Sequence, residues 1–200
     1  MSVDAPLLGR RERNKQAKLE RIVAAASALF AEHGVDDVTT QQIADAADIG
    51  TGTLFLYAKT KGELLLLVQN THYAAALERG RAQAAEAVDA LEGVMALVGP
   101  IVECNRVQID NGRTYLREMV FGDPSEPSHA EALSIVGRTE EAITGILVDR
   151  AQVSAEGAAA SARVVSAIVF LELGAGVNAD ASNPELLANI RRQVAAILPR

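Results

Sequence analysis

Residues 38–66, VTTQQIADAADIGTGTLFLYAKTKGELLL, decide the fold of this chain. Thr39 and Gln42 stand in the S/T-x-x-E/Q spacing of a capping box, which predicts that a helix begins there. Ile43 and Ala47 lie one turn apart, so this helix has a narrow apolar side. The small alanines of the segment would let a second helix cross it closely.

A tight turn and a second short helix follow. Asp48 stands where the chain must turn, and Asp is tolerated in the left-handed conformation that suits Gly best. Residues 50–57 can then form a short helix with Leu54 and Ala58 on its buried side. Lys61 opens the next helix. The pattern predicts a helix-turn-helix whose second helix is sized to enter a major groove.

Eleven positions of this stretch match a known pattern in register: Thr39 or Thr40, Ile43, Ala44, Ala47, Ile49, Gly52, Leu54, Phe55, Tyr57, Lys61 and Leu64. The pattern, T-x-x-x-I-A-x-x-A-G-V-s-x-G-x-L-Y-x-Y-F-x-x-K-x-x-L, is that of TetR-family transcriptional regulators, whose DNA-binding domain the stretch therefore resembles. Asp48 replaces the usual Gly, Gly50 replaces Ser, Thr51 replaces a frequent Lys or Arg, and Ala58 replaces Phe. Thr51 removes one contact with DNA, and Ala58 thins the local core. The competing interpretation is an ordinary helical hairpin inside a core.

The resemblance implies an all-α fold of about nine helices and a division into three parts. These are a flexible basic arm (1–13), a helix-turn-helix DNA-binding domain (14–60) and a ligand-binding and dimerisation domain (61–200). It implies a repressor that binds a palindromic double-stranded DNA operator as a homodimer and is released by a small lipophilic effector. The alternatives are an activator, or a helical binding module of the same fold that acts without DNA.

Composition agrees with a globular protein of this kind. The chain has 200 residues, of which 49% are hydrophobic, and its single cysteine, Cys104, excludes an internal disulfide framework and fits a reducing cytosol. The first 15 residues lack the apolar core of a signal peptide. Residues 167–177, AIVFLELGAGV, form the nearest candidate for a membrane span, and Glu172 interrupts them. We therefore expect a cytoplasmic protein without a membrane segment.

The charge is unevenly distributed. The net charge is −7, yet residues 10–21, RRERNKQAKLER, hold six basic and two acidic side chains. From residue 62 onward there are 11 Arg and 18 Asp or Glu, so this part alone carries the net −7. The part of the chain before residue 62, which is neutral overall and has a basic edge, can approach the phosphates of DNA, while the acidic part that follows is repelled from them. A solvated charged arm is the alternative for residues 10–15.

Helical periodicity extends along the rest of the chain. The expected helices cover residues 14–33, 39–47, 50–57, 61–85, 84–110, 113–121, 128–150, 154–177 and 180–198. Pro100 predicts a kink in its helix, and Gly80 is expected to loosen the end of the fourth. Asn111-Gly112 predicts a turn. Asn183 is expected to cap the last helix, with Pro184 at its first position.

The last two long helices predict a dimer interface, because they offer more apolar surface than one thin layer can bury. The residues concerned are Ala159, Ala162, Val165, Ala167, 169–173, Leu186, Leu187, Ile190, Val194 and Ile197. Packing within one subunit is the alternative. A two-fold dimer would place two recognition helices about 34–36 Å apart, the spacing of successive major grooves.

Candidate DNA-binding residues follow from the helix-turn-helix. Those expected at base edges or the groove floor are Thr51, Gly52, Thr53, Phe55 and Leu56, because hydroxyls bond base edges and apolar side chains meet thymine methyls. Those expected at phosphates are Thr40, Gln41, Tyr57 and Lys61. Phe55 could equally pack against the first helix.

The resemblance also implies a small-molecule pocket in the larger domain. Its candidate lining is Met95, Val98, Cys104, Tyr115, Met119, Phe121 and Phe170, although such residues at helical spacing are more often plain core. Only four aromatics lie beyond residue 62, so an aliphatic pocket for a lipophilic ligand is expected.

The sequence shows no catalytic constellation. His33, His72 and His129 lack partners at metal-ligand spacing, and Gly50-x-Gly52 follows no strand and lacks the third glycine of a nucleotide loop. We expect neither an enzyme, nor a metal site, nor a cofactor.

Overall fold

The computed structural model describes residues 9–198, which contain nine α-helices, one short 3-10 helix and no strand, as expected of an all-α fold. The helices are α1 (Arg10–His33), α2 (Thr40–Ala46), α3 (Thr51–Leu54), α4 (Lys61–Ala85), α5 (Ala90–Asn105), α6 (Ile109–Phe121), α7 (Pro127–Ala151), α8 (Ala155–Gly174), η1 (Gly176–Asn178) and α9 (Asn183–Ile197).

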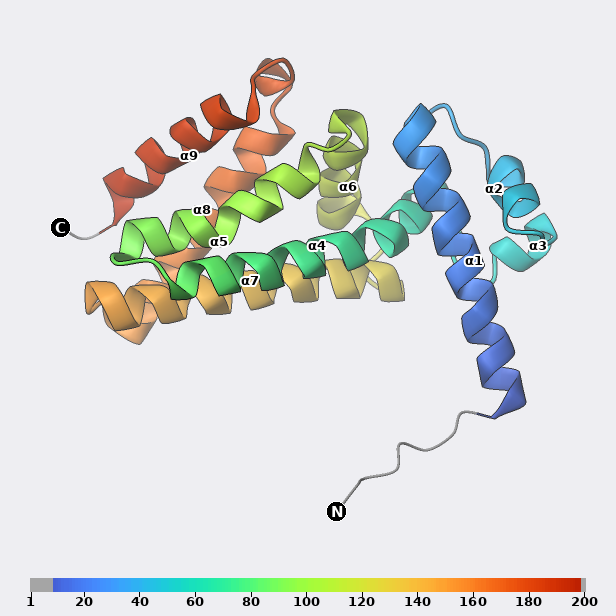
Figure 1. Ribbon diagram of the computed structural model, residues 1–200, viewed down its shortest axis with the longest axis horizontal. Coiled ribbons are helices and arrows are strands. Elements are labelled where there is room, and N and C mark those ends of the chain that lie inside the picture. The colour runs from blue at the N-terminus through green and yellow to red at the C-terminus, as the bar shows by residue number, and fades with distance from the viewer. Residues whose placement is uncertain (1–8, 199–200) are drawn as a thin grey trace.

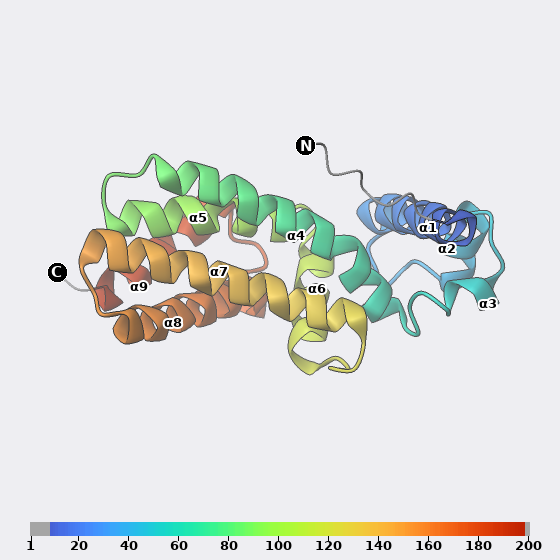
Figure 2. The same cartoon turned by 90° about the horizontal axis from the view of Figure 1, so that it is seen from below.

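Two helical parts make up the molecule (Figure 1). The first three helices form a small unit at one end, and α4 leads from it into a bundle with α5, α7, α8 and α9. Figure 2 shows α6 between the bundle and the small unit. Helix α1 packs against α2 and α4, so the apolar core continues from one unit into the other.

The small unit is held by a few fully buried side chains. Ile22, Ala26 and Phe30 lie at three- or four-residue spacing on α1 and bury one face of that helix. Ile43 from α2 and Leu54 from α3 join the same core. Helix α1 begins at Arg10, four residues before the expected start, so residues 10–13 are helical rather than part of an arm. The remaining arm residues, 1–8, lie outside the described residues.

Several expectations for the middle of the chain are wrong. The expected helix 84–110 is divided by a loop after Ala85 and ends at Asn105, whereas Pro100 lies inside a helix as expected. Asn111-Gly112 is not a turn, because both residues belong to the first turns of α6. Gly80 does not loosen α4. It allows close packing, because a Cβ there would stand 2.2 Å from the backbone oxygen of Leu97 on α5.

The last helix is capped by Ser182 rather than by Asn183. Ser182 and Glu185 form a capping box, in which the backbone amide of Ser182 donates to the Glu185 carboxylate at 2.8 Å. Asn183 instead accepts from Nε of Arg106 at 3.2 Å. The guanidinium of Arg106 also donates to backbone carbonyls at Asn178, 179 and 181, so it ties the end of α5 to the loop before α9.

Helix α8, which contains most of the membrane-span candidate 167–177, is long and apolar enough to cross a membrane by length and composition alone. Its packing accounts for part of this apolarity. Ala158, Ala162, Val165, Val169 and Leu173 form one buried face against the bundle. The opposite face stays exposed.

Candidate nucleic-acid interface and effector cavity

Local rules determine the turn between α2 and α3. Thr39 caps α2: its backbone amide donates to Oε1 of Gln42 at 2.8 Å, and the Gln42 amide donates to Oγ1 of Thr39 at 3.2 Å. The predicted capping box is confirmed. Asp48 has φ of 53°, in the left-handed region that the turn requires. Its carboxylate also meets the guanidinium of Arg21 on α1 at 3.4 Å.

Helix α3 shows a clear division between its inner and outer side. Leu54 and Ala58 are 1% and 5% exposed and anchor the segment in the core. The next two side chains point outward, with Phe55 45% and Leu56 84% exposed. Phe55 therefore lies on the surface, which is the first of the two roles considered for it. A Cβ built at Gly52 would meet nothing within 4 Å, so the surface around it is open.

The polar groups around α3 form an ordered surface. The hydroxyl of Thr51 donates to Oε1 of Gln41 on α2 at 2.7 Å, and Nε2 of Gln41 donates to Asp45 at 2.7 Å. Thr40 and Thr53 are half-buried. These hydrogen bonds fix the orientation of polar side chains on the surface of α2 and α3.

Tyr57 and Lys61 make contacts that the sequence reading missed. The Tyr57 hydroxyl donates to the backbone carbonyl of Lys15 at 3.3 Å. The Lys61 ammonium donates to the carbonyls of Asp36 and Val38 at 2.9 and 3.2 Å, so it fastens the loop after α1. Because an ammonium has three N–H donors, one remains for a further acceptor.

The basic edge of this unit lies on α1. Arg10, Arg11, Lys15 and Lys18 are exposed in its first half. Figure 1 shows this part of α1 extending beyond α2 and α3. The first half of α1 therefore carries exposed basic side chains in the same unit as α3.

The bundle contains a cavity of about 330 Å³ that is partly open to solvent. Four of the seven sequence candidates line it, namely Val98, Tyr115, Met119 and Phe170. The structure does not place the other three at its wall: Met95 and Cys104 are half-buried beside the core, and Phe121 is 81% exposed.

The sequence analysis did not predict Tyr73, the wall from α7, or the residues of α8 other than Phe170. On α7, Ala132, Ile135, Val136, Thr139 and Ile143 repeat at helical spacing and face the cavity. That repeat is indistinguishable from ordinary core in the sequence. Arg163, Glu140 and Ser166 are the charged and small polar residues of the lining, which is otherwise dominated by aliphatic and aromatic side chains.

Two stacked tyrosines form the inner end of the cavity. The rings of Tyr73 and Tyr115 lie 4.3 Å apart and nearly parallel, at 13°. Burial raises the pKa of both hydroxyls above the usual value. Both hydroxyls are hydrogen-bonded: Tyr115 donates to Oδ1 of Asn70 at 2.9 Å, and Tyr73 accepts from Nδ2 of Asn105 at 2.6 Å. Burial also raises the pKa of the Cys104 thiol to about 11.

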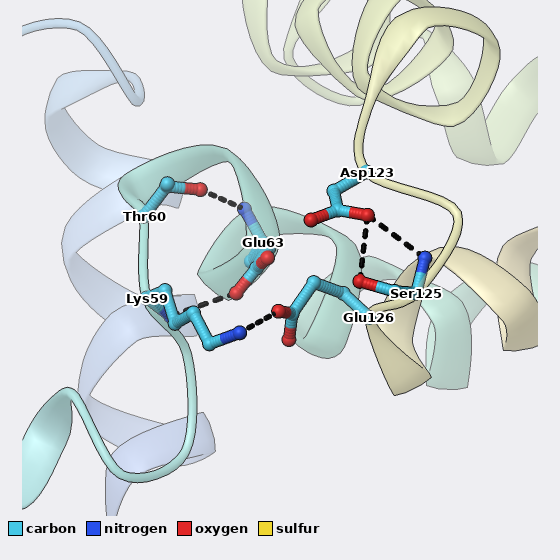
Figure 3. Close-up of polar contacts among 6 residues, drawn as sticks. All are labelled: Lys59, Thr60, Glu63, Asp123, Ser125 and Glu126. Atoms are coloured by element: carbon cyan, nitrogen blue, oxygen red, sulfur yellow. Dashed lines mark hydrogen bonds and ion pairs between the residues drawn. The ribbon is translucent and has the colours of Figure 1, made fainter.

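An ion pair joins the loop between the small unit and α4 to the bundle (Figure 3). Lys59, in the loop before α4, contacts the carboxylate of Glu126 at the start of α7. The Glu126 side chain is 12% exposed and that of Lys59 71%. The hydrogen bond and the charge of Glu126 raise the pKa of Lys59.

The loop around this pair is organised by hydrogen bonds. The backbone amide of Lys59 donates to the buried Glu63 carboxylate at 2.7 Å, and Thr60 caps α4 by accepting from the Glu63 amide at 3.0 Å. On the other side, the Ser125 hydroxyl and amide donate to Asp123 at 2.7 and 2.9 Å, which lowers the pKa of that carboxyl. Both partners of the ion pair therefore start from ordered backbone.

No group of three or more His, Cys, Asp or Glu side chains within residues 9–198 is placed to hold a metal ion. Four features therefore stand out: the exposed side of α3, the basic first half of α1, the apolar cavity in the bundle, and the polar contacts that join the small unit to the bundle.

Comparison with known proteins bears on these features. Residues 22–68 match the family model for bacterial regulatory proteins of the tetR family. No curated protein matches the sequence of this chain. The match is to regulatory proteins rather than to an enzyme family.

Solved structures share the fold over nearly the whole chain. A TetR transcriptional regulator from Rhodococcus sp. RHA1 has 19% identity and a TM-score of 0.68, covering 92% of this chain and 97% of its own. Thermus thermophilus FadR, a TetR-family transcriptional repressor solved with lauroyl-CoA, has 23% identity and a TM-score of 0.68, covering 90% and 93%. Bacillus subtilis FadR, solved with stearoyl-CoA, has 17% identity and a TM-score of 0.63, covering 90% and 97%.

Proposed function

Because this chain is a TetR-family transcriptional regulator by its DNA-binding domain and its fold, we propose that it is a repressor that binds a palindromic operator as a homodimer. The observation that carries this proposal is the outward face of α3. A short helix whose Leu54 is 1% exposed, while the neighbouring Leu56 is 84% exposed, offers an apolar surface that the monomer leaves uncovered. In the same unit, residues 10–21 of α1 hold six basic and two acidic side chains, although the chain is net acidic.

We assign the candidate contacts by their position on this face. Thr51, Gly52, Thr53, Phe55 and Leu56 would meet base edges and thymine methyls, because they surround the exposed side of α3. Thr40 and Gln41, at the start of α2, would meet phosphates near the helix N-terminus. Lys61 and Tyr57 already bond the backbone of the unit, so their part is first to hold its loops and only then to offer a remaining donor to phosphate.

The proposed dimer uses a narrower set of residues than the sequence suggested. Ala162, Val165, Val169, Leu186, Ile190 and Val194 are buried within one protomer, so they are core rather than interface. The exposed apolar side chains of α8 include Val164, at 47%, and Leu171, at 65%, together with Ala159, Ala160 and Ala167. Ile197 of α9 is also exposed. A second copy covering this surface would explain why so apolar a helix lies at the surface.

The proposed effector occupies the cavity. Its volume of about 330 Å³ lies at the small end of the usual range for ligand pockets, and its lining is largely apolar. Two neighbours of the same fold were solved with acyl-CoA, so fatty acyl-CoA thioesters are the first ligands to test. Effector and operator would weaken each other's binding by the same factor, because coupling between two sites is reciprocal.

The domain assignment follows from these roles. We propose that residues 10–60 form the DNA-binding domain and residues 61–200 the ligand-binding and dimerisation domain, in a cytoplasmic protein. Activation of transcription and a DNA-independent binding role are the competing functions.

A salt-dependent gel shift on the promoter beside its own gene tests the proposal. A repressor of this kind retards that DNA, and raising the salt weakens binding with a slope set by the number of phosphate contacts. Lys61→Ala is expected to weaken binding to all sequences and to reduce the slope by about one unit. Absence of a shift at low salt would favour the DNA-independent module.

A further inference from the structure

The two parts of the molecule are joined by one fully buried polar side chain, Asn111, on the first turn of α6. Asn111 is 2% exposed. Its Oδ1 accepts from the backbone amide of Val35 at 2.6 Å, and its Nδ2 donates to the backbone carbonyl of Phe30 at 2.7 Å. Both partners belong to the end of α1 and lie 76 and 81 positions away in the sequence.

These two hydrogen bonds satisfy backbone groups at the C-terminal end of α1 and in the residue that follows its cap. The carbonyl of Phe30 lies in the last turn, where helical carbonyls lack intrahelical partners, and it also accepts from Gly34 at 3.0 Å. Val35 is the first residue after Gly34, whose φ of 78° turns the chain. A carboxamide supplies one donor and one acceptor on the same short side chain, so Asn bonds both backbone groups at once. Because these groups are buried, losing the carboxamide would leave the Val35 amide without its acceptor, while the Phe30 carbonyl would keep only the bond from Gly34.

The same turn of α6 is bonded to the wall of the cavity. Nδ2 of Asn105 donates to the carbonyl of Gly112 at 3.2 Å and to the hydroxyl of Tyr73 at 2.6 Å. Tyr73 stacks on Tyr115, and both rings line the cavity. A Cβ at Gly112 would stand 2.2 Å from the backbone oxygen of Asn105, so the start of α6 and the end of α5 are in direct contact.

Adjacent residues of α6 therefore hold the DNA-binding domain on one side and the cavity wall on the other. We propose that Asn111 is a positioning residue that sets the orientation of the DNA-binding domain, and that the Tyr73–Asn105 hydrogen bond makes this clamp sensitive to the cavity. A ligand that displaces the tyrosine stack loosens the bond between Asn105 and the start of α6, and the clamp on α1 loosens with it. A role for this series of hydrogen bonds in releasing DNA rests on the proposed function, whereas the structural connection between the cavity and α1 does not.

The exposed ion pair between Lys59 and Glu126 forms a second connection, with different chemistry. It joins α7 to the loop before α4, and Lys59 is 71% exposed, so salt screens it. The clamp at Asn111 is uncharged and buried, so it keeps its geometry at the salt concentrations that weaken DNA binding. This difference lets the two connections be separated by experiment.

The test follows hydrogen exchange of the Val35 amide by NMR in the full-length protein, without DNA or ligand. Asn111→Ala is expected to speed this exchange about tenfold, because the amide loses its acceptor. Tyr73→Phe removes only a hydroxyl remote from α1 and is expected to speed it about threefold. Tyr57→Phe is the matched control, because its hydroxyl bonds Lys15 within the DNA-binding domain, and it is expected to leave Val35 unchanged.

The double variant Asn111→Ala/Tyr73→Phe should exchange no faster than Asn111→Ala alone, because both changes act through one connection. Asn111→Ser provides a milder variant if the alanine form does not fold. Unchanged exchange in the Asn111 variants would overturn the clamp. Unchanged exchange in Tyr73→Phe, or equal effects of Tyr73→Phe and Tyr57→Phe, would overturn its sensitivity to the cavity. If the protein bound no DNA but Tyr73→Phe still sped up Val35 exchange, the proposed function would be wrong and this inference would stand.

Discussion

Two leucines in and just after α3, two positions apart, should lose DNA binding for different reasons when each is replaced by alanine. Leu54 is 1% exposed and Leu56 is 84% exposed. Leu54→Ala removes three carbon atoms from a site where the four-residue α3 is anchored, and buried Leu→Ala changes cost about 2–5 kcal/mol. With about 3 kcal/mol lost, amide exchange in residues 40–58 should speed up on the order of 100-fold, because 1.4 kcal/mol is a factor of ten.

Leu56→Ala should leave stability within about 0.5 kcal/mol, as for other surface substitutions. Its cost should appear on DNA instead. At about 0.8 kcal/mol per buried CH₂, partial burial of this side chain in a groove contributes about 1–2 kcal/mol, or about 5- to 30-fold in affinity. Val88→Ala, at a side chain 94% exposed in the loop between α4 and α5, should change neither quantity.

The assays are hydrogen-exchange mass spectrometry without DNA, and fluorescence anisotropy with a labelled duplex covering the promoter beside the gene. Leu54→Ala should lose DNA binding because the segment opens, whereas Leu56→Ala should lose it with the segment closed. If Leu56→Ala bound DNA as tightly as the wild type, or opened the segment as Leu54→Ala does, the division of α3 into an anchoring and a reading side would be refuted.

Three further results are expected. Cys104 should react slowly with a thiol reagent at pH 8, because a pKa of about 11 leaves about one thiolate per thousand; reaction as fast as free cysteine would contradict its burial. Lys59→Met should lower the denaturation midpoint slightly at pH 7, and the difference should vanish as the pH rises above about 10.5, because a raised pKa stabilises the fold below the unfolded value and is lost on deprotonation; a difference that persists at high pH would argue against the pair with Glu126. Ser182→Ala should cost about 1 kcal/mol in urea unfolding, and the cap should weaken as the pH falls below about 4.5, because hydrogen bonds from Ser182 lower the pKa of Glu185; an unchanged midpoint would exclude the cap.

The helix-turn-helix could be predicted because its rules are local. Thr39 and Gln42 interact within one turn, and Asp48 adopts the left-handed conformation that its position demands. Asn111 was misread for the same reason, since Asn-Gly is a turn signal only when nothing else binds the amide. Here the amide is used by residues 76 and 81 positions away.

The cavity and the dimer surface depended on distant packing. Gly80 was read as a weak point, but its function is set by Leu97 of another helix. Apolar positions on α8 and α9 do not reveal whether they face the core or a partner, and half of those expected at an interface, such as Val165 and Ile190, are buried within the protomer. Phe121 looked like pocket lining by composition and is 81% exposed, because the chain ends α6 there.

Hydroxyl-radical footprinting on the promoter DNA tests the central claim most directly. Two copies of α3 in successive major grooves should protect two patches whose centres are about 10–10.5 base pairs apart, with related sequences on opposite strands. A single protected patch, or protection without such a repeat, would contradict the proposal that a dimer presents this helix to DNA.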